Sequence, residues 1–338
     1  MMRIVQIAIA LWALAAAVAE AAAPIGINYG RLGDNLPPPP EVVQMFRQNG
    51  VTKMRLFDPD PNVLNALKNS NISVALGVRN QDLQLMSTNT DAVNGWFNAN
   101  IAPLMNEVAF EYIVVGNELV PGDLANFLLP VMQNFQALLD NRQIKTIGVT
   151  TCVATSVFGN SYPPSASVFA DNSKEVMTKI LGFLAYVQRP LFINLYPYFA
   201  YASDPVNIRL DYAQFTAAGV VVQDGPLGYT NMLDAMIDAF FWSMEKVGVS
   251  NVGVVVSESG WPSGGNGNLT NPELASTYNK NFAKRITTQN GTPKRPDAVI
   301  PGYIFAMFNE NQKPPGVEQN FGLFNPITKQ PIYPCFPL

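Results

Sequence analysis

Two glutamates follow runs of apolar residues that predict buried strands. Glu118 ends the segment VVGNE at residues 114–118, and Glu258 follows the β-forming run VVVS at residues 254–257. If both strand ends meet at one edge of a sheet, one carboxyl group can protonate a leaving oxygen while the other attacks or stabilises the positively charged centre. This chemistry splits an acetal, and Glu118 and Glu258 are the leading candidates for it.

Polar and aromatic residues accompany both glutamates. Asn117 can hydrogen-bond a sugar hydroxyl beside the reacting carbon, and nearby negative charge would raise the pKa of Glu118 and keep it protonated. Trp261 follows a glycine bend after Glu258 and can stack on the apolar face of a pyranose ring; the alternative is that it packs beneath its loop. The other predicted strands are followed by Tyr29, Asp58, Tyr196, Tyr198, Asn309 and Glu310.

The chain of 338 residues contains no histidine. This excludes Ser-His-Asp and Cys-His catalysis and metal sites built on histidine, because each needs an imidazole as base or ligand. The two cysteines, Cys152 and Cys335, are too few for a dense disulfide framework; they can be paired, free or buried, and they do not make a metal site. We therefore expect carboxylate chemistry without a metal or a cofactor.

The composition favours a neutral partner. The net charge is -4, and 48% of the residues are hydrophobic, enough for a sizeable core. An acidic chain without a basic patch argues against a nucleic-acid partner and against attraction to anionic membranes. We expect a monomer that binds a neutral substrate.

The N-terminal residues 1–21 predict a secretory signal. Arg3 supplies a basic end, residues 4–18 supply an apolar stretch, and the letters AEA at residues 19–21 supply a cleavage site with small residues. The apolar stretch of about 15 residues is shorter than the ~20 that a spanning helix needs, so a membrane anchor is the less favoured alternative. The mature protein would begin near Ala22.

Export makes three asparagine sequons relevant as glycosylation candidates, although such triplets also arise by chance. Asn71 adjoins a predicted strand, whereas Asn268 and Asn290 lie in loop sequence rich in Gly, Asn and Pro. We therefore favour Asn268 and Asn290.

Eight short apolar runs alternate with helical patterns along residues 22–338. They are rich in Val, Ile, Tyr and Phe, as is typical of strands buried on both faces. The runs lie at residues 26–29, 53–57, 73–77, 112–115, 144–150, 191–196, 253–257 and 302–307. Repeated βα units predict a parallel sheet, and eight of them predict a single-domain α/β protein with a (β/α)8 TIM-barrel fold. The rival, an open doubly wound sheet, would need a glycine-rich phosphate loop that the early sequence lacks.

Four segments between these runs show the spacing of amphipathic helices. They span residues 39–48, 124–139, 172–187 and 231–247. Asn172 and Ser173 give a cap signal at the start of the third segment. In a barrel of this kind the functional residues lie at the carboxyl ends of the strands, which is where the polar residues described above fall.

Six blocks of sequence carry a resemblance to a known family. They are residues 26–30 (GINYG), 115–118 (VGNE), 194–198 (NLYPY), 257–262 (SESGWP), 305–310 (FAMFNE) and 318–324 (EQNFGLF). Their order and spacing resemble plant glucan endo-1,3-β-glucosidases of glycoside hydrolase family 17 over essentially the whole mature chain.

The resemblance implies roles for particular residues. It makes Glu118 the acid/base after the fourth strand and Glu258 the nucleophile after the seventh. Glu310 and Lys313 match the family pattern Phe-Asn-Glu-x-x-Lys-Pro, and a lysine there can restrain nearby carboxylates as anions; a surface ion pair is the alternative.

Several aromatic residues acquire a role by the same resemblance. Tyr29 and Tyr196 match tyrosines whose hydroxyl groups can hydrogen-bond the nucleophile and keep it ionised. Residues predicted to bind the substrate are Tyr198, Phe199, Trp261, Phe308 and Asn309. Without the resemblance, Tyr29, Tyr196, Phe199 and Phe308 would each be interpreted as core packing.

The resemblance implies a retaining hydrolase of internal β-1,3 linkages in callose, fungal-wall glucan or laminarin. One alternative is a β-1,3-1,4-glucanase of the same family, and another is a non-catalytic protein that binds wall glucan. We expect secretion to the apoplast rather than the vacuole, and a single domain without an additional sugar-binding module, because the chain ends shortly after the last predicted strand.

Overall fold

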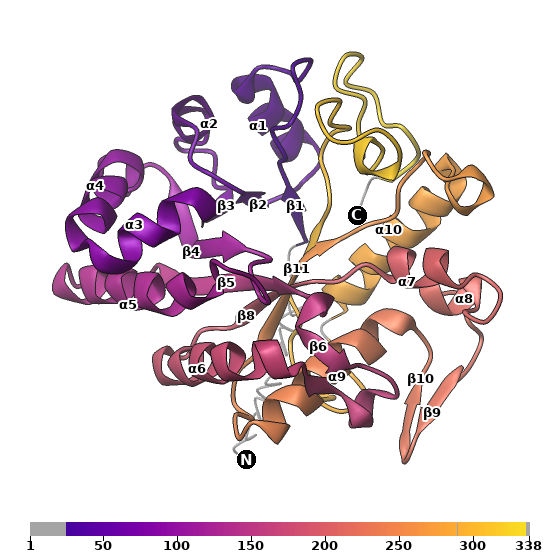
Figure 1. Ribbon diagram of the computed structural model, residues 1–338. Helices are drawn as coiled ribbons and strands as arrows, with labels where there is room; N and C mark the ends of the chain where they lie inside the picture. Colours follow the sequence, from indigo (N-terminus) through magenta and orange to yellow (C-terminus); the bar gives the residue numbers. More distant parts are fainter. Residues whose placement is uncertain (1–24, 289, 336–338) are drawn as a thin grey trace, which may run out of the picture.

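Eight parallel strands form a closed barrel, and helices surround it (Figure 1). The computed structural model describes residues 25–288 and 290–335; the predicted secretory signal at residues 1–21 lies outside the described residues. The strands run around the ring in the order of the sequence: β1 Gly26–Asn28, β2 Lys53–Leu56, β3 Ser73–Val78, β4 Ala109–Asn117, β5 Gly148–Ala154, β8 Leu191–Asn194, β11 Val254–Ser259 and β12 Gly302–Ile304. The prediction of a (β/α)8 barrel is confirmed.

All eight predicted strands are present, but some begin or end elsewhere. β4 extends further at both ends than residues 112–115. β5 begins at Gly148 rather than at residue 144, because the N–H of Ile144 still donates to the carbonyl of Leu139 at the end of the preceding helix. The strand ends are the least certain part of such a prediction, since they depend on the neighbouring strand's register.

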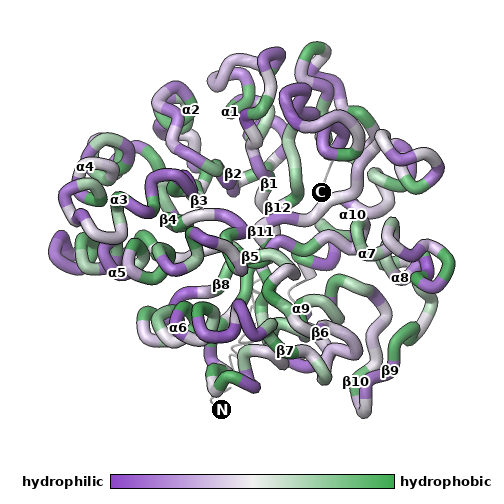
Figure 2. The backbone as a smooth tube through the Cα atoms, in the orientation of Figure 1, coloured by the Kyte–Doolittle hydropathy of each residue, from purple (hydrophilic) through white to green (hydrophobic). Residues whose placement is uncertain are grey.

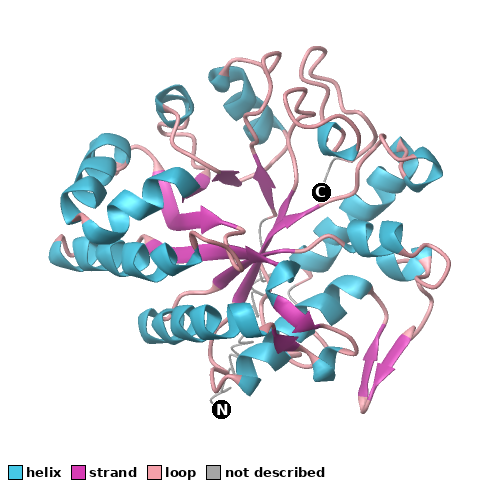
Figure 3. Ribbon diagram, viewed as in Figure 1, coloured by secondary structure: helices cyan, strands magenta, loops and turns pink. Residues whose placement is uncertain are grey.

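Helices follow seven of the eight strands and form the outer layer (Figure 3). Their bounds are α1 Pro39–Gln48, α2 Pro61–Ala66, α3 Leu83–Thr88, α4 Thr90–Asn100, α5 Ala125–Asn141, α6 Asp171–Val187, α7 Pro197–Ser203, α8 Leu210–Ala213, α9 Met232–Lys246 and α10 Pro272–Thr287. Within the described residues 305–335 no α-helix follows β12; this stretch folds back over the barrel, with Ala306 and Phe321 joined by a backbone hydrogen bond of 3.1 Å.

The four predicted helices correspond to α1, α5, α6 and α9. The predicted cap of the third is wrong: α6 starts at Asp171 after Ala170, and no side chain caps its first turn. Ser173 is buried inside the helix instead, where its hydroxyl faces Asn172. Figure 2 shows hydrophobic and hydrophilic stretches alternating along the helices, as expected for elements that pack on one face.

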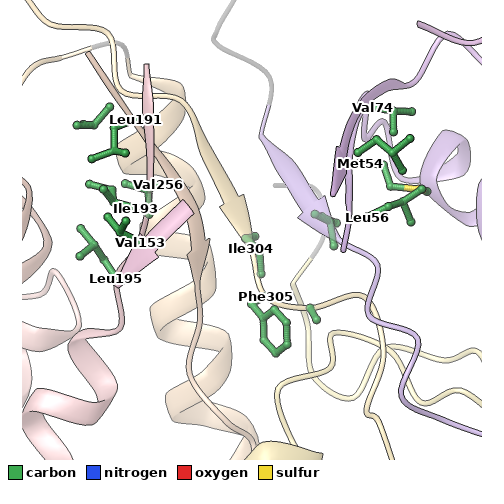
Figure 4. Close-up of a cluster of buried hydrophobic side chains, with 14 of the residues drawn as sticks. Met54, Leu56, Val74, Val153, Leu191, Ile193, Leu195, Val256, Ile304 and Phe305 are labelled. Carbon is green, nitrogen blue, oxygen red and sulfur yellow. The ribbon is translucent and has the colours of Figure 1, made fainter. Parts of the chain in front are cut away.

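The strands present their side chains to two apolar layers. One layer lies between the strands and the helices, and Figure 4 shows part of it, with Met54 and Leu56 on one side and Leu191 and Ile193 on the other. A smaller cluster fills the barrel itself and consists of Ala75, Val114, Cys152, Phe192, Val255 and Tyr303. The barrel is therefore a packed core, and a ligand can be bound only at one of its ends.

Two short antiparallel hairpins extend the loops that follow β5 and β8. One joins β6 (Phe158–Asn160) to β7 (Val168–Phe169), and the other joins β9 (Val222–Asp224) to β10 (Leu227–Tyr229), which projects from the barrel in Figure 1. The first hairpin is tied to α9 by a hydrogen bond between the hydroxyls of Ser167 and Ser243.

In the part of the chain that the structure describes, no helix has the length and apolar character needed to cross a membrane.

Both cysteines are free and buried, which settles the three possibilities left open by the sequence. Burial raises the pKa of each thiol, Cys152 and Cys335, to about 12, so both are protonated and shielded from reagents.

We predict that the native protein shows no thiol reactive with Ellman's reagent and that two thiols react after unfolding in guanidinium. The physical reason is that neither sulfur is exposed and neither is a thiolate at neutral pH. An unfolded, non-reduced protein without reactive thiols would reveal a disulfide and contradict the structure.

Candidate active site

The carboxyl ends of the strands open into a cleft with a volume of about 1470 Å³. Its position is the one expected of a functional site in a barrel. Eight of the residues selected from the sequence line it: Tyr29, Asn117, Glu118, Tyr196, Phe199, Glu258, Glu310 and Lys313. The two glutamates from opposite halves of the sequence are thus brought into one cavity.

Glu118 is placed by an irregular end of β4. The pairing of β4 with β5 shifts register between Val114 and Asn117, and both Gly116 and Glu118 have positive φ angles, +69° and +57°. A bulge of this kind redirects the side chain that follows it. The N–H of Glu118 donates to the carbonyl of Cys152 at 3.0 Å, which holds the turned backbone against β5.

Asn80 fixes the same turn from the other side. Its side chain accepts from the N–H of Asn117 at 2.9 Å and donates to the carbonyl of Asn117 at 3.2 Å. The two bonds continue the ladder between β3 and β4 after the last paired residues, Val78 and Val115. A side-chain amide can take the place of a strand in this way because it carries one donor and one acceptor, as the backbone does.

Glu258 follows a second irregularity, at the end of β11. Here the pairing with β8 shifts register between Val256 and Glu258. The carboxylate is buried, and three side chains donate to it: Arg55 Nη1 at 2.8 Å, Asn194 Nδ2 at 2.8 Å and Tyr196 Oη at 2.8 Å. Three donors, one of them cationic, thus surround this carboxyl group.

The amide of Asn194 joins the two glutamates. Its Nδ2 donates to Glu118 Oε1 at 2.7 Å and to Glu258 Oε1 at 2.8 Å. The two carboxylate oxygens therefore lie no further apart than these two bonds placed end to end. No role was predicted for Asn194, although it opens one of the blocks that carry the family resemblance.

Arg55 is the cation of the site, and its side chain is only 2% exposed. It lies on β2, pairs with Glu258, and donates through Nη2 to Asn117 Oδ1 at 2.7 Å. Arg55 was not among the residues predicted from the sequence. The signal was present, because a charged residue in the middle of the apolar strand KMRL is costly to bury unless it meets an acceptor.

The surroundings of Glu118 favour its protonated form. Burial raises the pKa of this carboxyl above its ordinary value, and the negative charge of Glu258 raises it further; the hydrogen bond from Asn194 and the charge of Arg55 act in the opposite direction and are smaller. The two carboxyl groups therefore differ in their environment: Glu258 is surrounded by three donors, whereas Glu118 has one donor and a raised pKa.

Glu310 and Lys313 lie at the rim of the cleft. Glu310 accepts from the N–H of Leu32 at 2.8 Å, and Lys313 Nζ lies 3.4 Å from the carboxylate of Glu310 and 4.1 Å from the ring centre of Phe305. Lys313 Nζ also lies 3.9 Å from Glu318, so it pairs with two carboxylates, of which Glu310 is the nearer and the more buried. This pair connects the loop after β12 to the loop after β1, which closes one side of the cleft.

The two tyrosines predicted beside the nucleophile differ. Tyr196 donates to Glu258, and burial raises the pKa of its hydroxyl well above the ordinary value, so it stays a donor. Tyr29 lines the cleft, but its buried hydroxyl has no hydrogen-bond partner in the structure, and its ring packs against Phe308 with 6.2 Å between ring centres. Only Tyr196 makes the predicted bond.

Four predicted substrate-binding residues do not line the cleft, and these predictions are corrected. Trp261 is fully buried and donates to the carbonyl of Leu269 at 3.0 Å, so its ring packs beneath the loop, as the alternative had it. Tyr198 and Phe308 are also buried, at 1% and 2% exposure, and the amide oxygen of Asn309 accepts from a backbone N–H in the C-terminal segment. Large aromatic residues next to catalytic motifs are more often supports than contacts.

Phe199 behaves as predicted, with 43% of its surface exposed in the cleft. A second exposed aromatic residue lines the same cavity: Tyr162, at 68% exposure, which no motif had selected. It belongs to the loop between β6 and β7, and sequence reasoning had no means of placing that loop beside the strand ends.

The three glycosylation candidates, Asn71, Asn268 and Asn290, are all exposed. Their exposure does not separate the two favoured asparagines from Asn71. The preference drawn from the sequence therefore stays a prediction.

Two carboxyl groups, joined by one amide, lie at the mouth of an eight-stranded barrel. A pair of carboxyl groups in such a cleft is the arrangement that glycoside hydrolases use. The chain matches the family described as glycosyl hydrolases family 17 over residues 25–335. It is 52% identical over 317 residues to the probable glucan endo-1,3-beta-glucosidase BG4 of Arabidopsis thaliana, with 94% of this chain and 92% of the relative covered. It is 43% identical over 317 residues to a glucan endo-1,3-beta-glucosidase of Pisum sativum, with 92% and 84% covered. The chain belongs to glycosyl hydrolase family 17.

Solved structures agree with this membership. CJP38, a beta-1,3-glucanase and allergen of Cryptomeria japonica pollen, is 44% identical, with a TM-score of 0.88 over 92% of this chain and 98% of that one. A structure from a pair of plant beta-glucan endohydrolases with distinct substrate specificities is 42% identical, with a TM-score of 0.87 over 92% of this chain and 99% of that one. The family resemblance inferred from the six sequence blocks is confirmed.

We predict that Arg55→Met lowers the free energy of unfolding at neutral pH by about 3–5 kcal/mol, because it leaves the buried carboxylate of Glu258 without its cation. Lys53→Met is the matched control: it removes a cation from the same strand, but one paired with Glu111 nearer the surface, and costs about 1 kcal/mol or less.

Denaturant unfolding of both variants and of Arg55→Met/Glu258→Gln measures the effect. The double variant should recover part of the loss, since it removes the unpaired charge. Equal losses for Arg55→Met and Lys53→Met would show that the buried pair does not constrain the fold.

Proposed function

We propose that the protein is a retaining endo-hydrolase of β-1,3-glucans, with Glu258 as nucleophile and Glu118 as acid/base. The observation that carries the proposal is the single amide of Asn194, which donates to both carboxyl groups at 2.7 and 2.8 Å inside the cleft of a family 17 barrel. Relatives that are 52% and 43% identical bear the name glucan endo-1,3-beta-glucosidase.

The reaction proceeds in two steps. In the first, Glu258 attacks the anomeric carbon, the glycosidic bond breaks, and Glu118 gives its proton to the departing oxygen. In the second, the ionised Glu118 takes a proton from water, the water oxygen attacks the same carbon, and the ester bond to Glu258 breaks. The two inversions restore the original configuration, and both carboxyl groups return to their starting protonation states.

The contacts of the two carboxyl groups support this division of roles. Glu258 receives hydrogen bonds from Arg55, Asn194 and Tyr196, which stabilise an anion aimed at the substrate. Among the described side chains, only Asn194 donates to the carboxyl group of Glu118, and burial and the neighbouring anion raise its pKa, which favours the proton that a leaving group needs.

The spacing supports retention. An inverting pair needs carboxyl groups ~6.5–9.5 Å apart to admit a water, whereas a retaining pair sits ~5–5.5 Å apart. Two oxygens bonded to one nitrogen at 2.7 and 2.8 Å fall below the inverting range.

The substrate proposed is an internal linkage of a neutral glucan such as callose, fungal-wall glucan or laminarin. A second candidate is mixed-linkage β-1,3-1,4-glucan, because a solved relative belongs to a pair of endohydrolases with distinct specificities. A purely glucan-binding role is disfavoured, since Glu118 and Glu258 and their hydrogen-bond donors are all in place.

The biological setting follows from the sequence. The predicted signal at residues 1–21 and the exposed sequon asparagines support export, glycosylation and action in the apoplast on wall or callose glucan.

We predict that the purified mature protein releases short oligosaccharides from laminarin whose new reducing ends first appear in the β configuration by proton NMR. Glu258→Gln and Glu118→Gln should each lower kcat by about 10²- to 10⁴-fold. Azide should restore turnover of an activated substrate to Glu118→Ala, because azide attacks the glycosyl-enzyme without a base, and it should not restore Glu258→Ala to a retaining reaction.

Each other outcome changes one part of the proposal. A first product in the α configuration excludes retention. Hydrolysis of mixed-linkage barley glucan in preference to laminarin moves the substrate to the second candidate, and retention of glucan without release of sugar favours the binding role.

We further predict that Tyr162→Ala and Phe199→Ala each raise KM for laminarin about fivefold with little change in kcat. Exposed rings in the cleft can stack on sugar rings away from the reacting bond, and such a contact is worth about 1 kcal/mol. Tyr186→Ala is the control, because this tyrosine is 86% exposed but lies outside the cleft. Equal KM values for all three variants would remove both rings from the binding site.

A further inference from the structure

The amide of Asn194 can serve both glutamates in only one orientation. Its Nδ2 faces Glu118 and Glu258, and its Oδ1 faces donors, the nearest charged one being Arg55 Nη1 at 3.3 Å. Rotating the amide by half a turn would place Oδ1 against two carboxylate oxygens and the NH2 group against a guanidinium. Both contacts would be repulsive, and the bridge between the carboxyl groups would be lost.

Two further side chains lie against Oδ1. Ser257 Oγ donates to it at 2.7 Å, and Cys152 Sγ lies 3.0 Å from it and 3.2 Å from Ser257 Oγ. Both residues are fully buried, on β11 and β5, and neither lines the cleft. They therefore cannot touch a substrate, and the reaction described above gives them no part.

We propose that Ser257 and Cys152 are positioning residues that lock the Asn194 amide in its bridging orientation and so set the protonation of Glu118. The inference deepens the proposed function and rests on the roles given there to Glu118 and Glu258.

The chemistry of the two side chains suits this task. The hydroxyl of Ser257 has one hydrogen, which it donates to Asn194 Oδ1. Burial keeps Cys152 a thiol, with its pKa raised to about 12, so its single hydrogen is available to Oδ1 or to Ser257 Oγ. Both groups are neutral, and they hold the amide without adding charge beside Glu258.

The consequence is a directional effect on pH dependence. Burial and the charges of Glu258 and Glu318 raise the pKa of Glu118, whereas the hydrogen bond from Asn194 and the charge of Arg55 lower it. If the amide is released, Glu118 loses this donor and its pKa rises. The alkaline limb of the kcat/KM profile, which reports loss of the proton from the acid, then moves to higher pH.

The test is kinetic. Ser257→Ala and Cys152→Ala should each lower kcat on laminarin several-fold, up to about tenfold, with KM nearly unchanged, and should move the alkaline limb upward. Cys152→Ser keeps a donor of similar size and should behave as the wild type in both respects. If Ser257→Ala folds poorly, the comparison of Cys152→Ser with Cys152→Ala still tests the proposal.

Matched controls separate positioning from general loss of packing. Ser243→Ala removes a buried serine hydroxyl that pairs with Ser167, and Cys335→Ala removes the other buried thiol; neither residue contacts Asn194. These controls should lower the melting temperature as much as the test variants do, without moving the pH profile.

A double-mutant cycle decides the mechanism. In an Asn194→Ala background, Ser257→Ala should cost no further kcat, because its effect passes through the absent amide. Losses that multiply, or a Cys152→Ala pH profile equal to wild type, would overturn the inference. Activity surviving in Glu118→Gln and Glu258→Gln would instead remove the proposed function itself, so the two failures are distinguishable.

Discussion

The ion pair between Arg55 and Glu258 is the constraint on which the site depends. A guanidinium inside a barrel loses its water, and only acceptors fixed by the protein can replace that hydration. Arg55 finds four: the Glu258 carboxylate, the amide oxygens of Asn117 and Asn194, and the carbonyl of Ser257. These acceptors belong to strands β11, β4 and β8, so a single buried cation links the strand ends that carry Glu118 and Glu258.

Arg55 compensates Glu258 more strongly than Glu118, so the two carboxyl groups have different electrostatic environments. Arg55 bonds directly to Glu258 and acts on Glu118 only through space. Burial and the neighbouring charge of Glu258 raise the pKa of Glu118, the carboxyl group that Arg55 compensates less. The difference between the two carboxyl groups is therefore built into the fold and does not require a bound ligand.

The barrel and the meeting of Glu118 and Glu258 in one cleft were predictable from the sequence because both depend on local patterns. Apolar runs predicted all eight strands, and the glutamates that follow two of them predicted where the carboxyl groups of the cleft would lie. Arg55, Asn194 and Asn80 were missed because their importance arises only when separate strands become neighbours, although a charge within an apolar strand was a usable warning. The opposite error occurred at Trp261, where nearness to Glu258 in sequence was taken for contact with the substrate, while the chain turned the ring into the core.

Departures from regular strand geometry place the side chains of the site. A regular parallel strand would leave Asn117 and Glu118 alternating in and out of the barrel, so that only one of them could face the cleft. The register shift in β4 and the left-handed backbone at Glu118 bring both into it. A left-handed glutamate costs energy and persists only where its surroundings hold it. The side chain of Asn80, by pairing with both backbone groups of Asn117, supplies that restraint at the point where the strand ladder ends. The irregular residues of the barrel are thus the ones that make its function possible.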